Sequence, residues 1–167
     1  MECNDHEVSM NKISDNKAKS ILPHDPLFLY WLAKELILEN PQEFKQLQEN
    51  LSLIPSVIEE TLRYRSPIQS IFRFAVNDVK LGGKMISSGQ KVIVWLGSAN
   101  RDETVFDCPD RFNITRDTKA HLAFGSGIHF CIGAPLARLE THIVLEVMLQ
   151  QQALHCLLNS ISDSVNT

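Results

Sequence analysis

The residues best suited to chemistry lie in segment 121–134, with the sequence HLAFGSGIHFCIGA. Cys131 precedes a segment with helical periodicity, so its thiol is expected at a helix N-terminus. The positive end of the helix dipole and free backbone N–H groups favour the thiolate there. The glycines Gly125, Gly127 and Gly133 let the chain turn sharply and approach a flat ligand closely. A thiolate can be a nucleophile or a metal ligand, and its apolar neighbours indicate an apolar wall rather than a polar active site.

This segment resembles the haem-thiolate loop of the cytochrome P-450 monooxygenases, whose pattern is Phe-Gly-x-Gly-x-(His or Arg)-x-Cys-x-Gly. Every fixed position of the pattern is filled. The resemblance implies that Cys131 is the axial ligand of the haem iron, that Phe124 packs near its sulfur and that His129 faces a haem propionate. Gly125 and Gly133 complete the haem-binding loop that the resemblance implies.

Four charged residues outside the loop also match positions that the family uses. Glu60 and Arg63 are three residues apart on a predicted helix, so they share a face and can form an ion pair. The resemblance implies that this pair is the Glu-x-x-Arg motif and that Arg111 completes a structural cluster bracing the haem loop, since buried charges need mutual pairing. It also implies that Arg73 meets a haem propionate. The alternative is that these residues are ordinary exposed charges.

Other interpretations of the cysteines and histidines have less support. A lone cysteine such as Cys131 is commonly a buried structural residue, but the complete loop pattern argues against that here. His121 and His129 together with Cys131 suggest zinc, yet a fourth ligand at usable spacing is lacking. No role is predicted for the remaining cysteines, Cys3, Cys108 and Cys156.

The elements that position these residues follow from apolar spacing and from prolines and glycines. Helices are predicted over residues 27–39, from Pro41 onward, and from Ile54 to just before Pro67. Residues 70–76 alternate as a strand does, and glycine-containing turns divide residues 79–96 into short strands. Residues 98–120 are predicted to be a polar, irregular loop.

The clearest predicted helix covers residues 134 to about 158. Its apolar stripe is predicted to pack in the core and consists of Leu136, Leu139, Ile143 and Val147, with Ala137, Val144 and Met148 beside it. Together these elements predict a mainly α fold with a small antiparallel β-sheet, an α+β protein. The resemblance specifies this fold as the C-terminal portion of a soluble bacterial cytochrome P-450 and covers residues 27–158.

Composition excludes several classes of function. The chain has 167 residues, 44% of them hydrophobic and 22% charged, which suits one globular domain. A net charge of −4 disfavours nucleic acid as a partner. The longest apolar run, residues 27–33, is shorter than the roughly 20 residues of a membrane span, and no secretory signal is recognisable. We therefore expect a cytoplasmic protein that binds neither nucleic acid nor membranes.

The resemblance implies an enzyme that binds haem b, which is iron protoporphyrin, and inserts one oxygen atom of dioxygen into a small organic substrate. It also implies a ferredoxin- or flavodoxin-like electron donor. Residues 1–22 are expected to form a loose tail, residues 23–158 the haem-thiolate portion and residues 159–167 a frayed end. Two alternatives are a truncated, non-catalytic fragment and one half of a split enzyme that needs a separate N-terminal half.

Overall fold

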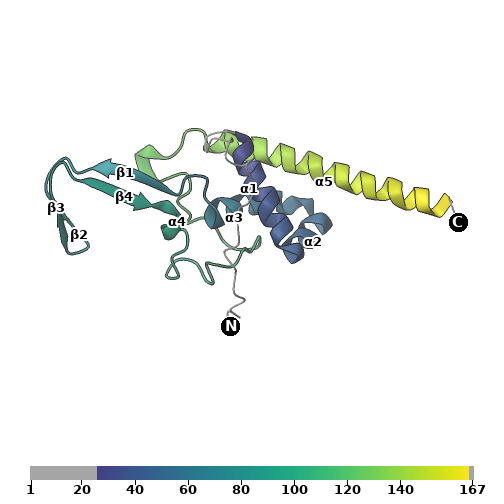
Figure 1. The fold of residues 1–167 in the computed structure, drawn as a ribbon, viewed down its shortest axis with the longest axis horizontal. Coiled ribbons are helices and arrows are strands. Elements are labelled where there is room, and N and C mark those ends of the chain that lie inside the picture. The colour runs from purple at the N-terminus through teal and green to yellow at the C-terminus, as the bar shows by residue number, and fades with distance from the viewer. Residues whose placement is uncertain (1–25, 166–167) are drawn as a thin grey trace, which may run out of the picture.

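The computed structural model describes residues 26–165, and within them the side chains of residues 28–151. The helices are α1 (Pro26–Glu39), α2 (Pro41–Glu49), the 3-10 turn η2 (Leu51–Leu53), α3 (Ile54–Tyr64), α4 (Leu96–Ala99), the 3-10 turn η3 (Gly127–His129) and α5 (Ala134–Val165). The strands are β1 (Ser70–Phe74), β2 (Val79–Leu81), β3 (Lys84–Ile86) and β4 (Lys91–Trp95). Figure 1 shows an elongated molecule, with the strands extending from one side of a helical centre and α5 from the other.

Prolines define the boundaries of the first three helices. Helix α1 ends where Asn40 precedes Pro41, because proline disfavours the helical conformation in the residue before it. Pro41 then begins α2 at a position whose backbone N–H would have no partner within the helix. Helix α3 likewise has Pro55 in its first turn and ends before Pro67. These predicted helices are confirmed.

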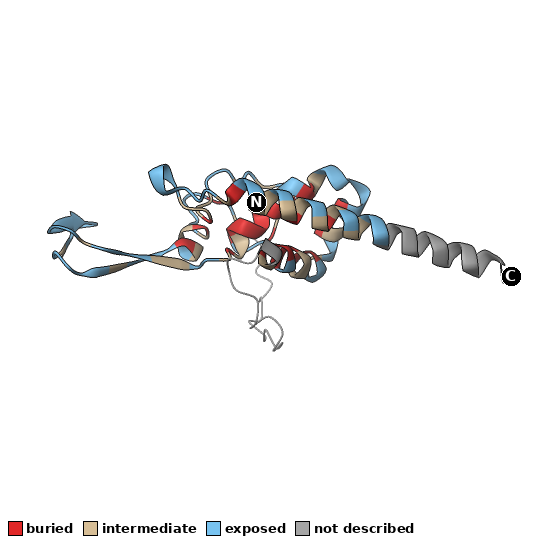
Figure 2. Ribbon diagram, turned by 90° about the horizontal axis from the view of Figure 1, so that it is seen from above, coloured by how far each residue is buried: buried red, intermediate tan, exposed pale blue. Residues whose placement is uncertain are grey.

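The core forms where α1, α3 and α5 pack against one another. Ala33 and Leu36 of α1, Ile58 and Leu62 of α3, and Leu145 of α5 are buried there. Figure 2 shows the buried residues gathered in the centre of the molecule, while the strand end is exposed. The helical centre is therefore the framework that holds the remaining segments.

The segment predicted to be a polar loop is more buried than expected. It has little regular structure after α4, yet Phe106, Phe112 and Ile114 are buried in it. Phe112 and Ile114 belong to the same core cluster as α1 and α3. Periodicity does not identify such residues, because each inserts its side chain singly from irregular backbone.

The predicted small sheet consists of two antiparallel ribbons. Strand β1 pairs with β4, which places Phe72 opposite Ile93, and β2 pairs with β3. Gly82 and Gly83 join β2 to β3 with φ values of 55° and 78°, the positive values that a two-residue hairpin turn requires. Strand β1 ends two residues earlier than predicted. The strand and turn predictions are otherwise confirmed.

Helix α5 confirms part of the predicted apolar stripe, because Ala137, Val144 and Met148 pack against the core. The exposed stripe, which corrects the rest of the prediction, is 45–58% exposed and comprises Leu136, Leu139, Ile143 and Val147. The buried positions of α5 lie on a neighbouring face and include Ala134, Thr141 and Leu145. Both faces carry apolar residues, so periodicity alone does not decide which one packs against α1 and α3.

The ends of the chain bear on two further predictions. Helix α5 continues to Val165, whereas the sequence predicts an end near Leu158. The tail predicted over residues 1–22 lies outside the described residues, as do residues 166–167. Within the described part of the chain, no helix is long and apolar enough to cross a membrane.

The packing of α5 predicts different effects for two leucine substitutions. Leu145→Ala should lower the free energy of unfolding by about 2–4 kcal/mol, because it leaves a cavity in the core. Leu139→Ala, on the exposed stripe, should change it by less than about 0.5 kcal/mol. Urea denaturation monitored by circular dichroism measures both. Equal losses would contradict the observed orientation of α5.

Candidate functional site

The loop that carries Cys131 is closed by its own backbone. The Cys131 N–H donates a hydrogen bond of 2.9 Å to the carbonyl of Phe124. Gly125 and Gly127 have φ values of 74° and 66°, a left-handed conformation that other residues adopt at a steric cost. Helix α5 begins at Ala134, directly after the loop. The glycines therefore permit the turn that presents the cysteine at the start of α5.

The Cys131 thiol is free and exposed. The carbonyl of Cys131 accepts a hydrogen bond of 3.2 Å from the Ala134 N–H, so the cysteine is tied to the first turn of α5. A Cβ atom on Gly133 would contact the Cys131 sulfur at 3.8 Å, and glycine leaves that space open. The side chains of Ile128 and Ile132 are almost wholly exposed. An open thiol among exposed apolar residues suits one face of a flat, apolar ligand that contains a soft metal.

Among the side chains that the structure describes, those of residues 28–151, no three His, Cys, Asp or Glu are grouped so that they could hold a metal ion. A metal bound at Cys131 would therefore have at most two such side-chain ligands among the described residues. This arrangement differs from a structural zinc site, which takes four protein ligands.

The other residues predicted to contact haem lie in different settings. Phe124 is half-buried and adjoins Cys131 through the backbone hydrogen bond. His129 is exposed at the end of η3. Arg73 lies in β1, one position from Phe72 and on the opposite face, and its Nη1 donates a hydrogen bond of 2.8 Å to the Phe72 carbonyl.

Arg63 and Glu60 form a fully buried ion pair on α3. The Nε and Nη2 atoms of Arg63 donate to the two carboxylate oxygens at 2.7 and 2.8 Å. Its other N–H groups donate to three backbone carbonyls at 2.9, 2.9 and 3.3 Å, those of Asn100, Pro109 and Arg111. A guanidinium has five N–H donors, and each has an acceptor here, which offsets the cost of burying the charge.

The second arginine whose side chain contacts Glu60 is Arg116, and not Arg111 as the sequence analysis predicts. The Arg116 Nε lies 3.4 Å from Glu60 Oε1, and its Nη2 donates to the Cys108 and Arg111 carbonyls. Arg111 contributes only this carbonyl to the cluster, and its side chain is exposed. The next residue, Phe112, inserts its ring into the core, so the preceding side chain is directed to solvent.

A second cluster surrounds Glu59, which neither motif nor spacing singles out. Arg138 of α5 donates through Nε and Nη2 to the two Glu59 carboxylate oxygens, the Nη2 bond being 2.9 Å long. His121 Nε2 lies 2.9 Å from Glu59 Oε2. His121 Nδ1 accepts a hydrogen bond of 3.2 Å from the Ala123 N–H. A neutral imidazole therefore carries its proton on Nε2 and donates a hydrogen bond from it to Glu59. The contacts span 62 and 79 positions in sequence, so local patterns cannot reveal them.

The charge of Glu59 is strongly stabilised by its partners. Burial alone would raise the pKa of this carboxyl, but hydrogen bonds from His121 and Arg138, together with their charges, lower it to about 2. The hydrogen bond to Glu59 raises the pKa of Arg138, partial burial opposes that rise, and negative charge on Glu59 and Cys131 adds to it. The Glu59 and Arg138 pair is therefore fully ionised at neutral pH.

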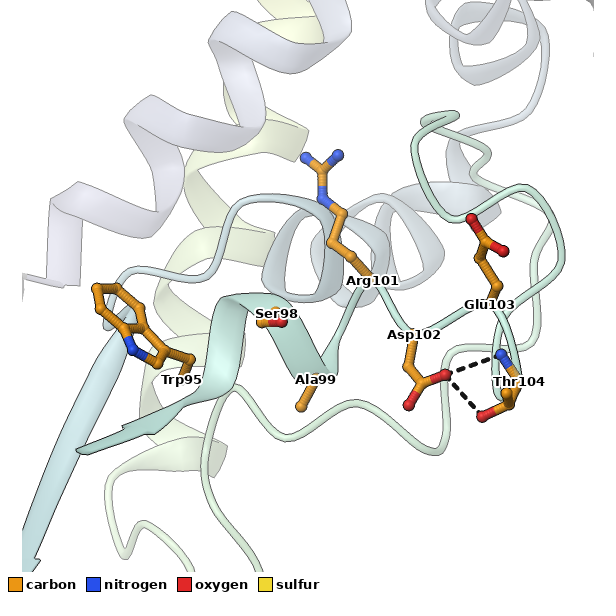
Figure 3. Close-up of a pocket in the computed structure, with 7 residues that line it drawn as sticks. All are labelled: Trp95, Ser98, Ala99, Arg101, Asp102, Glu103 and Thr104. Atoms are coloured by element: carbon orange, nitrogen blue, oxygen red, sulfur yellow. Dashed lines mark hydrogen bonds between the residues drawn. The ribbon is translucent and has the colours of Figure 1, made fainter. Parts of the chain in front are cut away.

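A shallow pocket of about 580 Å³ beside α4 is a different feature. Figure 3 shows Asp102 turned toward Thr104, whose N–H and hydroxyl donate to its carboxylate at 2.8 and 2.6 Å. Arg101 also lines this pocket and donates to the Tyr64 carbonyl at 2.9 Å. These polar groups bond within the protein, and the lining does not include Cys131. The Cys131 loop is therefore the candidate site.

Comparison with known proteins identifies the class to which this fold and loop belong. The sequence profile described as Cytochrome P-450 matches residues 34–166. The chain is 49% identical over 115 residues to putative cytochrome P-450 126 of Mycobacterium tuberculosis, an alignment covering 69% of this chain and 28% of that protein. It is 53% identical over 109 residues to cytochrome P-450 109 of Bacillus spizizenii, covering 65% and 27%.

The structural comparison agrees. The solved structure of cytochrome P-450 CYP109Q5 from Chondromyces apiculatus aligns with a TM-score of 0.71 at 53% identity, over 72% of this chain and 31% of that one. This protein therefore belongs to the cytochrome P-450 family, and the predicted family and α+β fold are confirmed. The chain spans less than a third of the length of these relatives and corresponds to a C-terminal segment.

The position of Arg116 in the Glu60 cluster leads to a prediction about two arginines. Arg116→Ala should lower the free energy of unfolding by about 1–3 kcal/mol, because the partly buried Cys108 carbonyl loses a donor and the buried Glu60 carboxylate loses one of its two arginine partners. Arg111→Ala removes an exposed side chain and should change it by less than about 0.5 kcal/mol. Denaturant titration at pH 7 measures the difference. A larger loss for Arg111→Ala would show that the sequence-based assignment was correct.

The lowered pKa of Glu59 predicts how its contribution to stability varies with pH. A carboxyl with a folded-state pKa of about 2, against an ordinary value of 4.5, stabilises the fold fully above pH 4.5 and progressively less as the pH falls toward 2. Glu59→Gln should therefore cost about 2 kcal/mol at pH 7, after allowance for 27% and 34% exposure of Glu59 and Arg138. The cost should shrink steadily toward pH 3.

Denaturant titrations from pH 7 to pH 3 test this dependence. Glu49→Gln is the matched control, because Glu49 pairs with Lys45 on the exposed surface of α2. It should change the free energy of unfolding by less than about 0.5 kcal/mol at every pH. A cost for Glu59→Gln that stays constant across the range would rule out the ionised carboxylate as its cause.

Proposed function

We propose that this protein is the haem-binding portion of a cytochrome P-450 monooxygenase and that Cys131 supplies the thiolate ligand of the haem iron. The observation that carries the proposal is the free, exposed Cys131 thiol at the first turn of α5, within a loop that fills every fixed position of the family pattern. Residues 23–158 form the proposed haem-binding portion. Haem b, when bound, supplies an iron at which dioxygen is activated, and a thiolate ligand favours O–O cleavage.

The residues around Cys131 have separate tasks in this proposal. The Phe124 carbonyl holds the Cys131 N–H, which fixes the direction of the cysteine. The N-terminal end of α5 favours the negative charge on sulfur. Gly125 and Gly133 keep side-chain atoms away from the turn and from the sulfur, so a flat ligand can approach.

Two further residues recognise the charged edge of the haem in this proposal. His129 and Arg73 are both exposed, and each would donate to a propionate carboxylate of bound haem. The exposed side chains of Ile128 and Ile132 would pack against the apolar macrocycle of bound haem and so keep water from the sulfur. Glu60, Arg63 and Arg116 remain a structural cluster, with Arg111 contributing its carbonyl.

The proposed reaction inserts one oxygen atom of dioxygen into a small organic substrate and reduces the other to water with two electrons and two protons. Its electrons come from a ferredoxin- or flavodoxin-like protein, as the family membership suggests. These statements concern the activity of whole family members, of which this chain matches less than a third. They are therefore proposals about the protein to which this portion contributes.

Exposed apolar side chains favour a second candidate function. Leu139 and Ile143 of α5 and Phe72 and Ile93 of the β1–β4 ribbon are each at least half exposed. Exposed apolar residues grouped on one element are typical of interfaces. In this alternative the chain is one half of a split enzyme and binds a separately encoded N-terminal half. A truncated, non-catalytic fragment is the third candidate.

A carbon monoxide difference spectrum tests the role of Cys131. The full chain is loaded with haemin, reduced and exposed to carbon monoxide. A strongly red-shifted Soret band is expected in the wild type and should be lost in Cys131→Ala, because the alanine variant has no thiolate to donate electron density. Glu49→Gln is the control, since it changes an exposed side chain of α2 outside the Cys131 loop and should retain the band.

The outcomes separate the three candidates. A band that Cys131→Ala does not remove would contradict thiolate ligation by this residue. A band that forms only when a separate N-terminal half of a bacterial family member is added, and co-purifies with it, would favour the split enzyme. Absence of the band under both conditions would leave the non-catalytic fragment.

A further inference from the structure

We infer that Glu59, His121 and Arg138 are positioning residues that hold the Cys131 loop against helix α3. His121 precedes the loop and Arg138 follows it, so one carboxylate on α3 binds both of the segments that flank the cysteine. The role of the cluster at haem rests on the proposed function, whereas its role in ordering the loop does not. None of these three residues is part of the family motif of the loop.

The two adjacent carboxylates of α3 serve different segments. Successive residues of a helix are rotated by about 100°, so neighbouring side chains point in different directions. Glu60 binds Arg63 and Arg116 and thereby fixes the irregular segment around residues 107–116. Glu59 turns to the other side and binds His121 and Arg138. A change at Glu59 should therefore affect the Cys131 loop and leave the Glu60 segment in place.

The contact from Arg138 continues to the cysteine in two steps. The guanidinium carbon lies 4.8 Å from the centre of the Phe124 ring, within the range of a cation–π contact. The Phe124 carbonyl in turn accepts the Cys131 N–H. Arg138 is thus fixed by Glu59, covers Phe124 and limits the movement of the residue that orients Cys131.

His121 holds the incoming end of the loop. Its ring is nearly buried and is bonded on both nitrogens, to Glu59 and to the Ala123 N–H. The next residue, Leu122, donates its N–H to Asn100 Oδ1 at 2.7 Å, and the Asn100 carbonyl accepts from the buried Arg63. The backbone before Phe124 is therefore attached to the helical core at consecutive residues.

Hydrogen exchange on the full chain without haem tests the ordering role. Glu59→Gln should accelerate exchange of the amides in residues 122–133 by about tenfold or more, including that of Cys131. The amides of residues 107–116 should change by less than about twofold, because the Glu60 cluster stays intact. Glu49→Gln, on the surface of α2, is the control and should alter neither segment.

Two substitutions at Arg138 separate positioning from a loss of the fold. Arg138→Lys keeps a charge that can reach Glu59 and should show a smaller acceleration than Arg138→Met, which keeps length but loses the charge. Both variants leave His121 and Glu59 in place, so they also serve if Glu59→Gln does not fold. Equal acceleration over residues 107–116 and 122–133, or none in residues 122–133, would overturn the inference.

A spectroscopic measurement tests the consequence at haem. With carbon monoxide bound, a disordered Cys131 loop should shift part of the red-shifted Soret band to the position given by a neutral ligand. That fraction should increase in the order wild type, Arg138→Lys, Arg138→Met. A missing band in the wild type would contradict the proposed function, while hydrogen exchange would still decide the positioning role. A band identical in all three proteins would overturn the role at haem.

Discussion

The structure depends on one buried guanidinium. Arg63 is wholly inaccessible to water, and its five donors must therefore find acceptors inside the protein. Glu60 supplies two, and backbone carbonyls between residues 100 and 111 supply three. Removing one partner of such a pair typically costs about 3–5 kcal/mol, since the other charge stays buried without compensation. An irregular segment is thereby fixed to α3 without helix or strand hydrogen bonds.

Helix α3 transmits this order to the candidate site. Glu60 and Arg63 form a cluster with no exposure, whereas Glu59 and Arg138 are about a third exposed. Solvent screens the second pair more strongly, so it holds its segment less tightly than the first. The Cys131 loop is accordingly attached to a rigid helix through contacts that are easier to break. Asn100 links the first cluster to the backbone beside His121, because its carbonyl accepts from Arg63 and its side chain accepts from the Leu122 N–H.

The protein is stabilised mainly by its helical core, because many apolar residues outside that core are exposed. The core lies where α1, α3 and α5 meet, and the β1–β4 ribbon contributes little to it. An isolated two-stranded ribbon is marginally stable in water, and the β1–β4 ribbon presents Phe72 and Ile93 to solvent. Stability therefore depends on a small helical centre, while the surfaces around it remain available for contact with another partner.

The sequence alone was sufficient to predict those elements and contacts that are determined by residues close together in the chain. Prolines ended the helices, glycines set the hairpin and the Cys131 turn, and the three-residue spacing of Glu60 and Arg63 brought them together. Tertiary structure decided which face of α5 is buried, which arginine joins Glu60, and that Glu59 meets residues 62 and 79 positions away. Periodicity shows that a face is apolar or a residue charged, but the partner is chosen by the packing of distant segments in three dimensions.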